Sequence, residues 1–290
     1  MRMDGRRQSG NVDDRRGSSS GRRIGIGGGI VGVILVAVIT LLGGGDLGDV
    51  FSNVMGSGAM ETTEQSSYQP DDVDNQLALF ASQVLAGTED VWTAEFQRLG
   101  LGSYRAPKMV LYTDAVSSGC GNATSQVGPF YCSADETVYI DLSFFRQMQQ
   151  NIGGDGDFAY AYVIAHEVGH HVQHLLGTLD QAHEQMSRVS ERDANRISVR
   201  LELQADYYAG VWAALDNKMF NSIEPGDIEE AVDVAGKIGD DYLQRKAYGR
   251  EMPDSFNHGR SEQRVRWFTR GLQYADINHG DTFTAEYSDL

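Results

Sequence analysis

Hydrophobic residues recur at helical spacing over two consecutive stretches between residues 73 and 99. Val73, Leu77, Phe80 and Val84 are spaced as on one face of an α-helix, and a second helical stripe follows over residues 91–99. A stripe of this kind packs against a core in globular proteins. We therefore place the start of a folded domain near Val73.

Two short runs have the composition of β-strands instead. Residues 109–112 and 137–142 are rich in Val, Ile, Leu and Tyr. The chain beyond them is mostly helical in pattern, over residues 158–176, 186–216, 227–245 and 261–274. A few strands followed by many helices predict an α+β fold for residues 73–290, mostly helical with a small sheet.

One segment has no polar face at all. Ile24–Leu42 contains 19 residues and no charge. As a helix rising about 1.5 Å per residue it would be roughly 28 Å long, which matches the hydrocarbon thickness of a bilayer. We predict a transmembrane helix here. A cleaved signal peptide is the alternative, but the 23 residues before the segment are long for one, and no Ala-x-Ala cleavage site follows.

The charges on either side of this segment differ in sign. Residues 1–23 contain seven arginines and three aspartates, and after Leu42 no Lys or Arg occurs until Arg98. By the positive-inside rule, residues 1–23 form a cytoplasmic tail and the main domain lies outside the cytoplasm. Residues 43–72 are rich in Gly, Ser and Asp, and we predict a flexible tether.

The overall composition excludes several classes of protein. The 290 residues carry 24 Lys and Arg against 41 Asp and Glu, a formal net charge of −17. A general nucleic-acid-binding protein needs a basic face, so we expect no nucleic-acid partner. Hydrophobic residues make up 41% of the chain, which is sufficient for a packed core.

Two cysteines lie between the predicted strands, at Cys120 and Cys132. Outside the cytoplasm, a disulfide between them is the natural interpretation, and two free buried thiols are the alternative. The disulfide would close a short loop and contribute about 3 kcal/mol if it is unstrained. Two cysteines alone are too few for a zinc site.

The clearest chemical signal is the sequence His166-Glu167-Val-Gly-His170. The spacing places two imidazoles one turn apart on the same face of a helix, so that both can bind one zinc ion. Glu167 follows the first histidine and can take a proton from a water on that zinc. The alternative is a buried histidine pair without a metal.

A zinc ion held by two histidines needs a third ligand and an open position. Glu202 is a candidate, because it lies in an otherwise apolar helical stretch where an unpaired carboxylate would be costly. Asp206 is four residues further, on the same face, and could hold the far nitrogen of one ligand histidine. A solvated acidic face of an amphipathic helix is the alternative for both residues.

Together these blocks resemble a bacterial family, the "putative neutral zinc metallopeptidases". The resemblance covers about residues 73–285 and implies that His166, His170 and Glu202 bind one zinc ion per chain and that Glu167 is the catalytic base. It also implies a zincin-like fold, in which the helix of the two histidines lies beneath a small sheet. The matching blocks are His166-Glu-Val-Gly-His170, Glu202-Leu-Gln-Ala-Asp206, Gly128-Pro-Phe-Tyr-Cys132 and Ser255-Phe-Asn-His258-Gly-Arg-Ser-Glu-Gln-Arg264.

The expected function is that of a zinc-dependent endopeptidase anchored in the bacterial cytoplasmic membrane, acting on peptides or proteins. We expect His258 to stabilise the oxyanion, because it lies in a Gly-flanked loop before a helix. By analogy with zincins, a substrate strand could pair with an edge strand at Val138–Leu142. The alternative is a catalytically silent zincin-like domain that binds a partner at the membrane.

Overall fold

The two predicted strands form the middle of a four-stranded sheet. The computed structural model describes residues 1–17 and 70–290. In it β2 (Lys108–Tyr112) pairs in parallel with β6 (Thr137–Asp141). β5 (Phe130–Cys132) adds to β6 in antiparallel orientation, and the strand order is β1-β2-β6-β5. β6 is thus an inner strand, and the prediction of an edge strand at Val138–Leu142 is wrong.

The outer strand on the other side comes from the N-terminal segment. β1 (Val12–Asp14) pairs in parallel with β2, with Val12 opposite Met109. The same segment is held by ion pairs, since Arg6 contacts Asp216 at 2.6 Å and Arg7 contacts Asp90 at 2.6 Å. Residues 1–17 are therefore part of the folded domain, not a separate tail on the opposite side of a membrane.

These findings correct the predicted fold class and location. Within residues 1–17 and 70–290, no helix has both the length and the apolar character that a membrane span requires. The transmembrane helix predicted at 24–42, and the tether up to residue 69, lie outside the described residues. The prediction of a single-pass anchor, with the N-terminus and the domain on opposite sides, is wrong for residues 1–17, because their strand belongs to the domain's own sheet.

The helices begin and end at residues suited to those positions. α3 (Asp72–Leu99) is one continuous helix, which starts with a capping box at Asp71 and ends at Gly100 in the left-handed conformation. Ser190 caps α7 (Glu191–Phe220), so this helix starts later than the predicted residue 186. The other α-helices in the described part of the chain are α4 (Ser143–Ile152), α5 (Asp157–Leu175), α6 (Thr178–Met186), α8 (Asp227–Lys237), α9 (Asp240–Tyr248) and α10 (Ser261–Tyr274).

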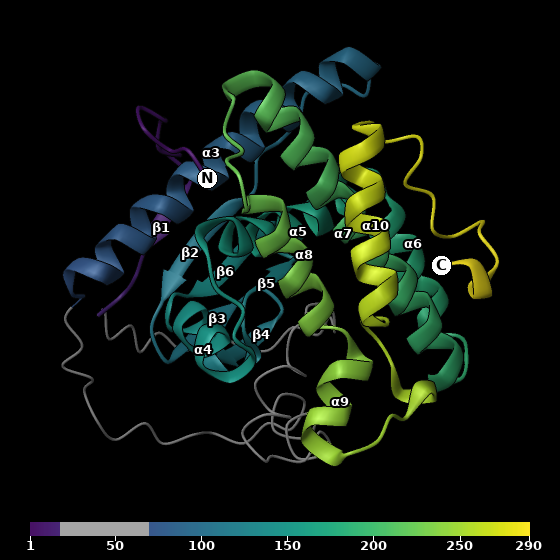
Figure 1. The fold of residues 1–290 in the computed structure, drawn as a ribbon. Helices are drawn as coiled ribbons and strands as arrows, with labels where there is room; N and C mark the ends of the chain where they lie inside the picture. Colours follow the sequence, from purple (N-terminus) through teal and green to yellow (C-terminus); the bar gives the residue numbers. More distant parts are fainter. Residues whose placement is uncertain (18–69) are drawn as a thin grey trace.

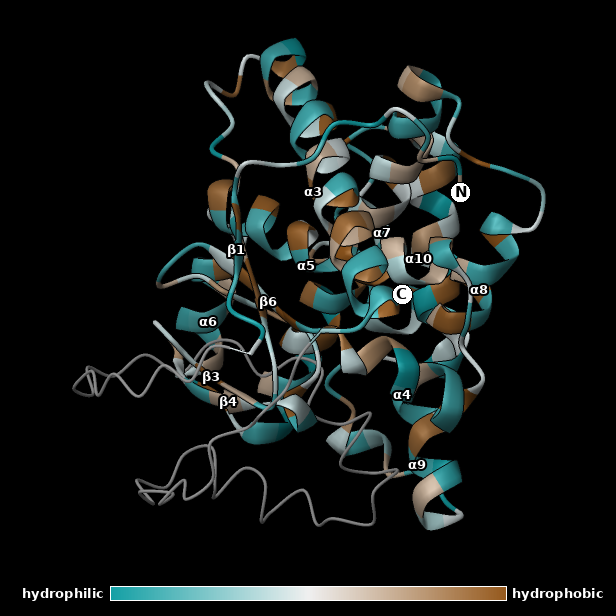
Figure 2. Ribbon diagram, turned by 90° about the vertical axis from the view of Figure 1, so that its left-hand side faces the viewer, coloured by the Kyte–Doolittle hydropathy of each residue, from teal (hydrophilic) through white to brown (hydrophobic). Residues whose placement is uncertain are grey.

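α5 lies at the centre of the molecule, between the sheet and the helices α7, α8 and α10 (Figure 1). It contacts α3, α7 and α8, and it also contacts the edge strand β5. All of its side chains from residue 161 to residue 173 are buried. Figure 2 shows hydrophobic stretches on the inner elements and hydrophilic turns on the outer helices, α4 and α9 among them. Because α5 is enclosed on every side, its polar side chains at 166–170 lie in the interior.

A small hairpin is attached to the edge of the sheet. β3 (Ala115–Ser118) pairs in antiparallel orientation with β4 (Gly121–Thr124). The predicted disulfide is present between Cys120, in the turn of this hairpin, and Cys132 at the end of β5, with the Cα atoms 5.8 Å apart. It fixes the hairpin to the edge strand that contacts α5.

Candidate metal centre

Three side chains from two helices converge in the core. His166 and His170 lie one turn apart on α5, and Glu202 reaches them from α7. The two Nε2 atoms are 3.2 Å apart, and the Glu202 oxygens lie 3.3 Å from Nε2 of His166 and 3.4 Å from Nε2 of His170. All three side chains are at most 2% exposed. The structure thus brings together the three residues that were predicted as ligands.

The close approach of α5 and α7 makes this convergence possible. Gly169 faces Ala205 at the crossing, and a Cβ atom on Gly169 would lie 3.0 Å from the Ala205 carbonyl oxygen and 3.1 Å from its Cα. These distances are tighter than ordinary van der Waals contacts, so a larger residue would push the helices apart. The glycine in the His-Glu-Val-Gly-His sequence therefore lets Glu202 reach the histidines.

Each histidine is oriented by a different partner. Nδ1 of His166 lies 2.8 Å from Oδ1 of Asp206, a carboxylate that can only accept. Nδ1 of His170 lies 2.8 Å from Oε1 of Gln173, whose Nε2 donates to the Leu201 carbonyl and to Gln204. Both Nδ1 atoms therefore carry protons and donate, which leaves the Nε2 lone pairs facing each other and Glu202.

This arrangement fits a metal cation. Two Nε2 lone pairs and a carboxylate are all acceptors, and they cannot satisfy one another without an added proton or cation. Neither oxygen of Glu202 has a hydrogen-bond partner within the described residues, although the side chain is buried. Two His nitrogens and a Glu oxygen are a typical ligand set of catalytic zinc sites. A divalent cation at this position would pair every one of these atoms.

Electrostatics within the cluster favour a bound positive charge. Burial alone would lower the pKa of His166, but the carboxylates of Asp206 and Glu202 outweigh it and raise that pKa to about 9. Burial would likewise raise the pKa of Glu202, but His170 and His166 hold it well below its usual range. The site thus stabilises a proton on His166 for the same reason that it would stabilise a metal ion.

Glu167 is a further buried carboxylate on α5, next to His166 in the sequence. It is fully buried, and neither of its oxygens has a hydrogen-bond partner in residues 1–17 and 70–290. Burial raises its pKa to about 7, although the charges of His166 and His170 oppose that shift. A carboxylate with a pKa close to neutrality, beside a ligand set that suits a metal, is suited to accept and return a proton.

Asp206 lies at the centre of a buried network that extends to a third helix. Its Oδ1 accepts from the hydroxyl of Tyr162 at 2.5 Å as well as from His166. Arg264 of α10 donates to both oxygens, with Nε 2.8 Å from Oδ2 and Nη2 2.9 Å from Oδ1. Burial would raise the pKa of Asp206, but Arg264 and His166 outweigh it and lower that pKa.

Three residues of the site were missed from the sequence. Tyr162 lies four residues before His166, and this helical spacing could have signalled its position on the same face. Gln173 is three residues after His170 and could have been found in the same way. Arg264 ends a sequence block that we used only for the family resemblance, and no spacing rule connects it with Asp206.

His258 lies outside the three-residue cluster. It is 3% exposed and is held by Asp240, which accepts from its backbone N–H at 2.7 Å and faces its Nδ1 at 3.1 Å. The backbone N–H of Gly259 donates to the same carboxylate. His258 is therefore fixed in orientation, with Nδ1 engaged and Nε2 free of hydrogen bonds to the described residues.

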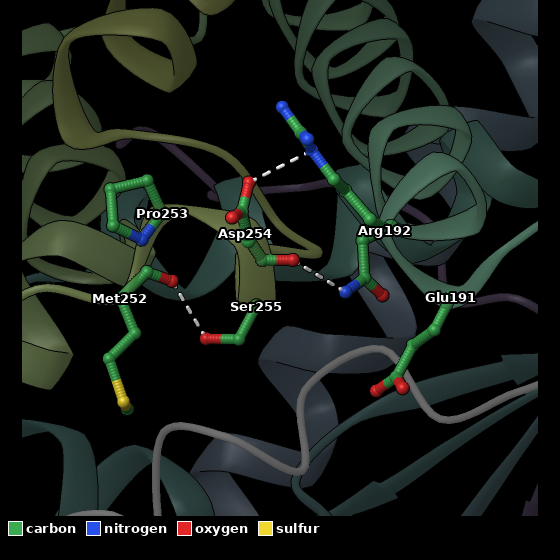
Figure 3. Close-up of a pocket in the computed structure, with 7 residues that line it drawn as sticks. Glu191, Arg192, Met252, Pro253, Asp254 and Ser255 are labelled. Atoms are coloured by element: carbon green, nitrogen blue, oxygen red, sulfur yellow. Dashed lines mark hydrogen bonds and ion pairs between the residues drawn. The ribbon is translucent and has the colours of Figure 1, made fainter.

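A surface pocket in the described part of the chain is separate from this cluster. It has a volume of about 410 Å³ and lies between the start of α7 and residues 252–255 (Figure 3). Arg192 contacts Asp254 across it at 3.0 Å, and Ser255 donates to the Met252 carbonyl. Neither His166, His170 nor Glu202 lines this pocket, so it is not the site of the expected chemistry.

Comparisons with known proteins agree with the chemistry of the cluster. A family described as "Putative neutral zinc metallopeptidase" matches residues 1–283. The chain is 45% identical over 290 residues to the "Uncharacterized protein YpfJ" of Escherichia coli K12, covering 98% of this chain and 99% of that protein. It is 43% identical over 195 residues to the "Uncharacterized protein Mb2605" of Mycobacterium bovis, covering 64% of this chain and 65% of that protein. No solved structure matches the chain.

Proposed function

The chain belongs to the family described as "Putative neutral zinc metallopeptidase", and from this membership and the geometry of its buried cluster we propose that it hydrolyses peptide bonds in a zinc-dependent reaction. The observation that carries the proposal is Glu167, a fully buried carboxylate without a hydrogen-bond partner in the described residues. An orphaned buried carboxylate is costly for stability. A catalytic role would explain why the Glu167 carboxylate is buried beside His166 and His170.

His166, His170 and Glu202 would hold the zinc ion. When bound there, zinc would act as a Lewis acid on the substrate carbonyl and on a water molecule. Asp206 and Gln173 keep the two imidazoles in the tautomer that presents Nε2. The protein thus supplies a preformed ligand set, and little reorganisation is needed on metal binding.

Glu167 is proposed to move the proton. Its carboxylate takes a proton from the attacking water and passes it to the nitrogen of the leaving amine. The pKa of about 7 supports this role, because a group that titrates near the working pH can both accept and donate. The absence of a competing hydrogen bond within the described residues leaves both oxygens available for the water.

His258 remains the proposed donor to the substrate oxygen that becomes negative. Asp240 accepts from Nδ1, which leaves Nε2 as the atom that can donate once the ring is protonated. The proposal predicts that His258→Asn lowers kcat more than it weakens zinc binding.

The test of the proposed function compares two Glu→Gln variants of the full chain. With casein as an unfolded substrate at pH 7.5, Glu167→Gln is expected to keep about one zinc and to lose at least ~100-fold in rate. The control is Glu184→Gln, since Glu184 is exposed on α6 and pairs with Arg188 on the surface. Unchanged hydrolysis by Glu167→Gln would contradict the assignment of the base.

A catalytically silent domain is the competing function. It predicts no hydrolysis by the zinc-loaded wild-type protein, and it gives no reason for a buried Glu167 that has no hydrogen-bond partner among the described residues. Absence of hydrolysis of a broad peptide library by the zinc-loaded wild type would favour it over the peptidase.

A further inference from the structure

Arg264 is an unusual residue to find in a protein core. Its side chain is 1% exposed, and burial of an arginine is costly unless its charge is paired and its donors are used. Its partner is Asp206, through two hydrogen bonds, and its Nη2 also lies 3.4 Å from the Tyr162 hydroxyl. Asp206 and Tyr162 belong to the network around His166, and Nη1 of Arg264 also donates to the Ile238 carbonyl at 3.5 Å.

The two oxygens of Asp206 are held differently. Oδ1 accepts from Tyr162, His166 and Arg264. Oδ2 accepts from Nε of Arg264 and from no other group in residues 1–17 and 70–290. Without Arg264 the carboxylate would be held by one oxygen and could rotate about its Cβ–Cγ bond. Arg264 thus fixes the plane of the group that orients His166.

The fold places Arg264 by a close crossing of two helices. α10 packs on α7 where Gly210 faces Gly271. A Cβ on Gly210 would lie 2.1 Å from the Phe268 carbonyl oxygen, and a Cβ on Gly271 would lie 2.0 Å from the Tyr207 carbonyl oxygen. The two backbones are therefore in direct contact, which leaves no freedom in the distance between Arg264 on α10 and Asp206 on α7.

From these contacts we propose that Arg264 is a positioning residue of the metal centre, which clamps Asp206 so that His166 presents Nε2 to the cation. The inference rests on the proposed zinc site and extends it to a third helix. A guanidinium suits this task because it can donate to both oxygens of a carboxylate in one plane, which a lysine ammonium cannot do.

A purely structural role for Arg264 makes a different prediction. In that case the ion pair only joins α10 to α7, and its loss lowers stability without changing the metal site of the molecules that remain folded. A positioning role predicts weaker zinc binding by folded protein and an effect that depends on Asp206. The two roles are thus separated by metal affinity, not by stability.

The experiment measures the zinc dissociation constant of the full chain by competition with a chromophoric chelator, below the melting temperature of each variant. Arg264→Gln is expected to weaken zinc binding by about 10- to 100-fold, and Arg264→Lys by a smaller factor. The matched control is Arg266→Gln on the same helix, since Arg266 is half exposed and pairs with Glu262 at 2.9 Å. The control is expected to bind zinc within about twofold of wild type.

A double variant tests whether Arg264 acts through Asp206. In an Asp206→Asn background there is no carboxylate to clamp, so adding Arg264→Gln should change zinc affinity by less than about threefold. The cobalt-substituted protein gives a second readout, because its visible absorption reports the ligand geometry. The spectrum of Arg264→Lys should differ from that of wild type.

The outcomes separate the inference from the proposed function. Wild-type zinc affinity and cobalt spectrum in folded Arg264→Lys or Arg264→Gln would overturn the positioning role and leave the zinc site intact. If Arg264→Gln weakens zinc binding by the same factor in the wild-type and Asp206→Asn backgrounds, the positioning role is also overturned. Should Arg264→Gln not fold, Arg264→Lys decides alone. Absence of zinc from the wild type would instead contradict the proposed function.

Discussion

Nε2 of His166 lies 3.2 Å from Nε2 of His170, and both rings have already used Nδ1 to donate to other partners. Two imidazole nitrogens at this distance need a positive charge between or beside them. In the metal-free protein that charge is a proton on His166, whose pKa is raised to about 9. In the zinc-bound protein it is the metal ion, so proton and zinc compete for the same lone pair.

The first prediction follows from this competition. At pH 7.5, which is below the pKa of about 9, metal-free His166 carries both ring protons, so zinc binding should release about one proton. The apparent zinc affinity should rise by about tenfold per pH unit toward pH 9 and level off above it. Titration calorimetry in buffers of different ionisation heat measures the released proton, and Glu167→Gln removes the second group that titrates nearby. Zinc binding without proton release would contradict the raised pKa.

The second prediction concerns Gln173, the partner of the other histidine. Replacing it with Met keeps the size of the side chain but removes the oxygen that accepts from His170 Nδ1. Zinc affinity should fall by about tenfold, because loss of such a partner leaves the ligand free to rotate. Gln181→Met on α6 is the control, since Gln181 is exposed. Equal zinc affinities of the two variants, measured by chelator competition, would show that His170 does not need this bond.

The third prediction is the pH dependence of hydrolysis. Glu167 must be deprotonated to accept a proton from water, and its pKa is about 7 in the absence of metal. A bound cation favours the carboxylate and can only lower that pKa. The rate should therefore fall as the pH drops below the pKa of Glu167 in the zinc-bound protein, which is about 7 or lower. Because one group titrates, log kcat/KM should fall by about one per pH unit. A plot of log kcat/KM against pH checks this, and a rate that rises toward acid would be incompatible with Glu167 as base.

The fourth prediction tests the position of the N-terminal segment. Arg6 pairs with Asp216, whose side chain is 1% exposed, so Arg6→Met leaves a buried carboxylate unpaired. Loss of a partner from a buried ion pair costs about 3 kcal/mol of unfolding free energy. Arg15→Met is the control, because Arg15 and its partner Asp13 are both exposed. Urea unfolding that gives the same stability for both variants would mean that residues 1–17 do not pack on the domain.

The parts of the fold that were predictable have strong local patterns. β2, β6, α5, α7 and α10 have long apolar runs or helical stripes, and their bounds differ from the prediction by a few residues. α6 was not predicted, and α8 and α9 were predicted as one helix. The interruption between α8 and α9 falls at Gly239, where a Cβ would lie 2.2 Å from the backbone nitrogen of Ser261. That contact is between distant parts of the chain, and no local pattern reveals it.

The missed elements have weak local signals. β1 contains one apolar residue, Val12, followed by two aspartates, and it is a strand only because β2 offers it a pairing edge. β3 has only four residues, two of them serines, and its positions alternate between exposed and partly buried. Their structure is decided by tertiary pairing, which overrides local preference. The error in the predicted location has the same origin, since the Arg-rich composition of residues 1–17 concealed their ion pairs with the domain.

The candidate site also contains residues that the sequence predicts and residues that only the tertiary structure reveals. His166, Glu167 and His170 lie within one helical turn and a half, so their spacing in sequence sets their spacing in space. Glu202 could be proposed as the third ligand because an unpaired carboxylate in an apolar stretch is costly. Arg264 is 58 residues from Asp206, and only the crossing of α7 and α10 brings the two together.

The central claim is that His166, His170 and Glu202 bind zinc, and its most direct test is the metal content of the purified full chain. Elemental mass spectrometry of wild-type protein, after growth with zinc, should find about one zinc per chain. His170→Ala, prepared in parallel, should contain almost none and should melt at the temperature of the chelator-treated wild type. Wild-type protein without bound metal, or a His170→Ala variant with undiminished zinc, would contradict the account.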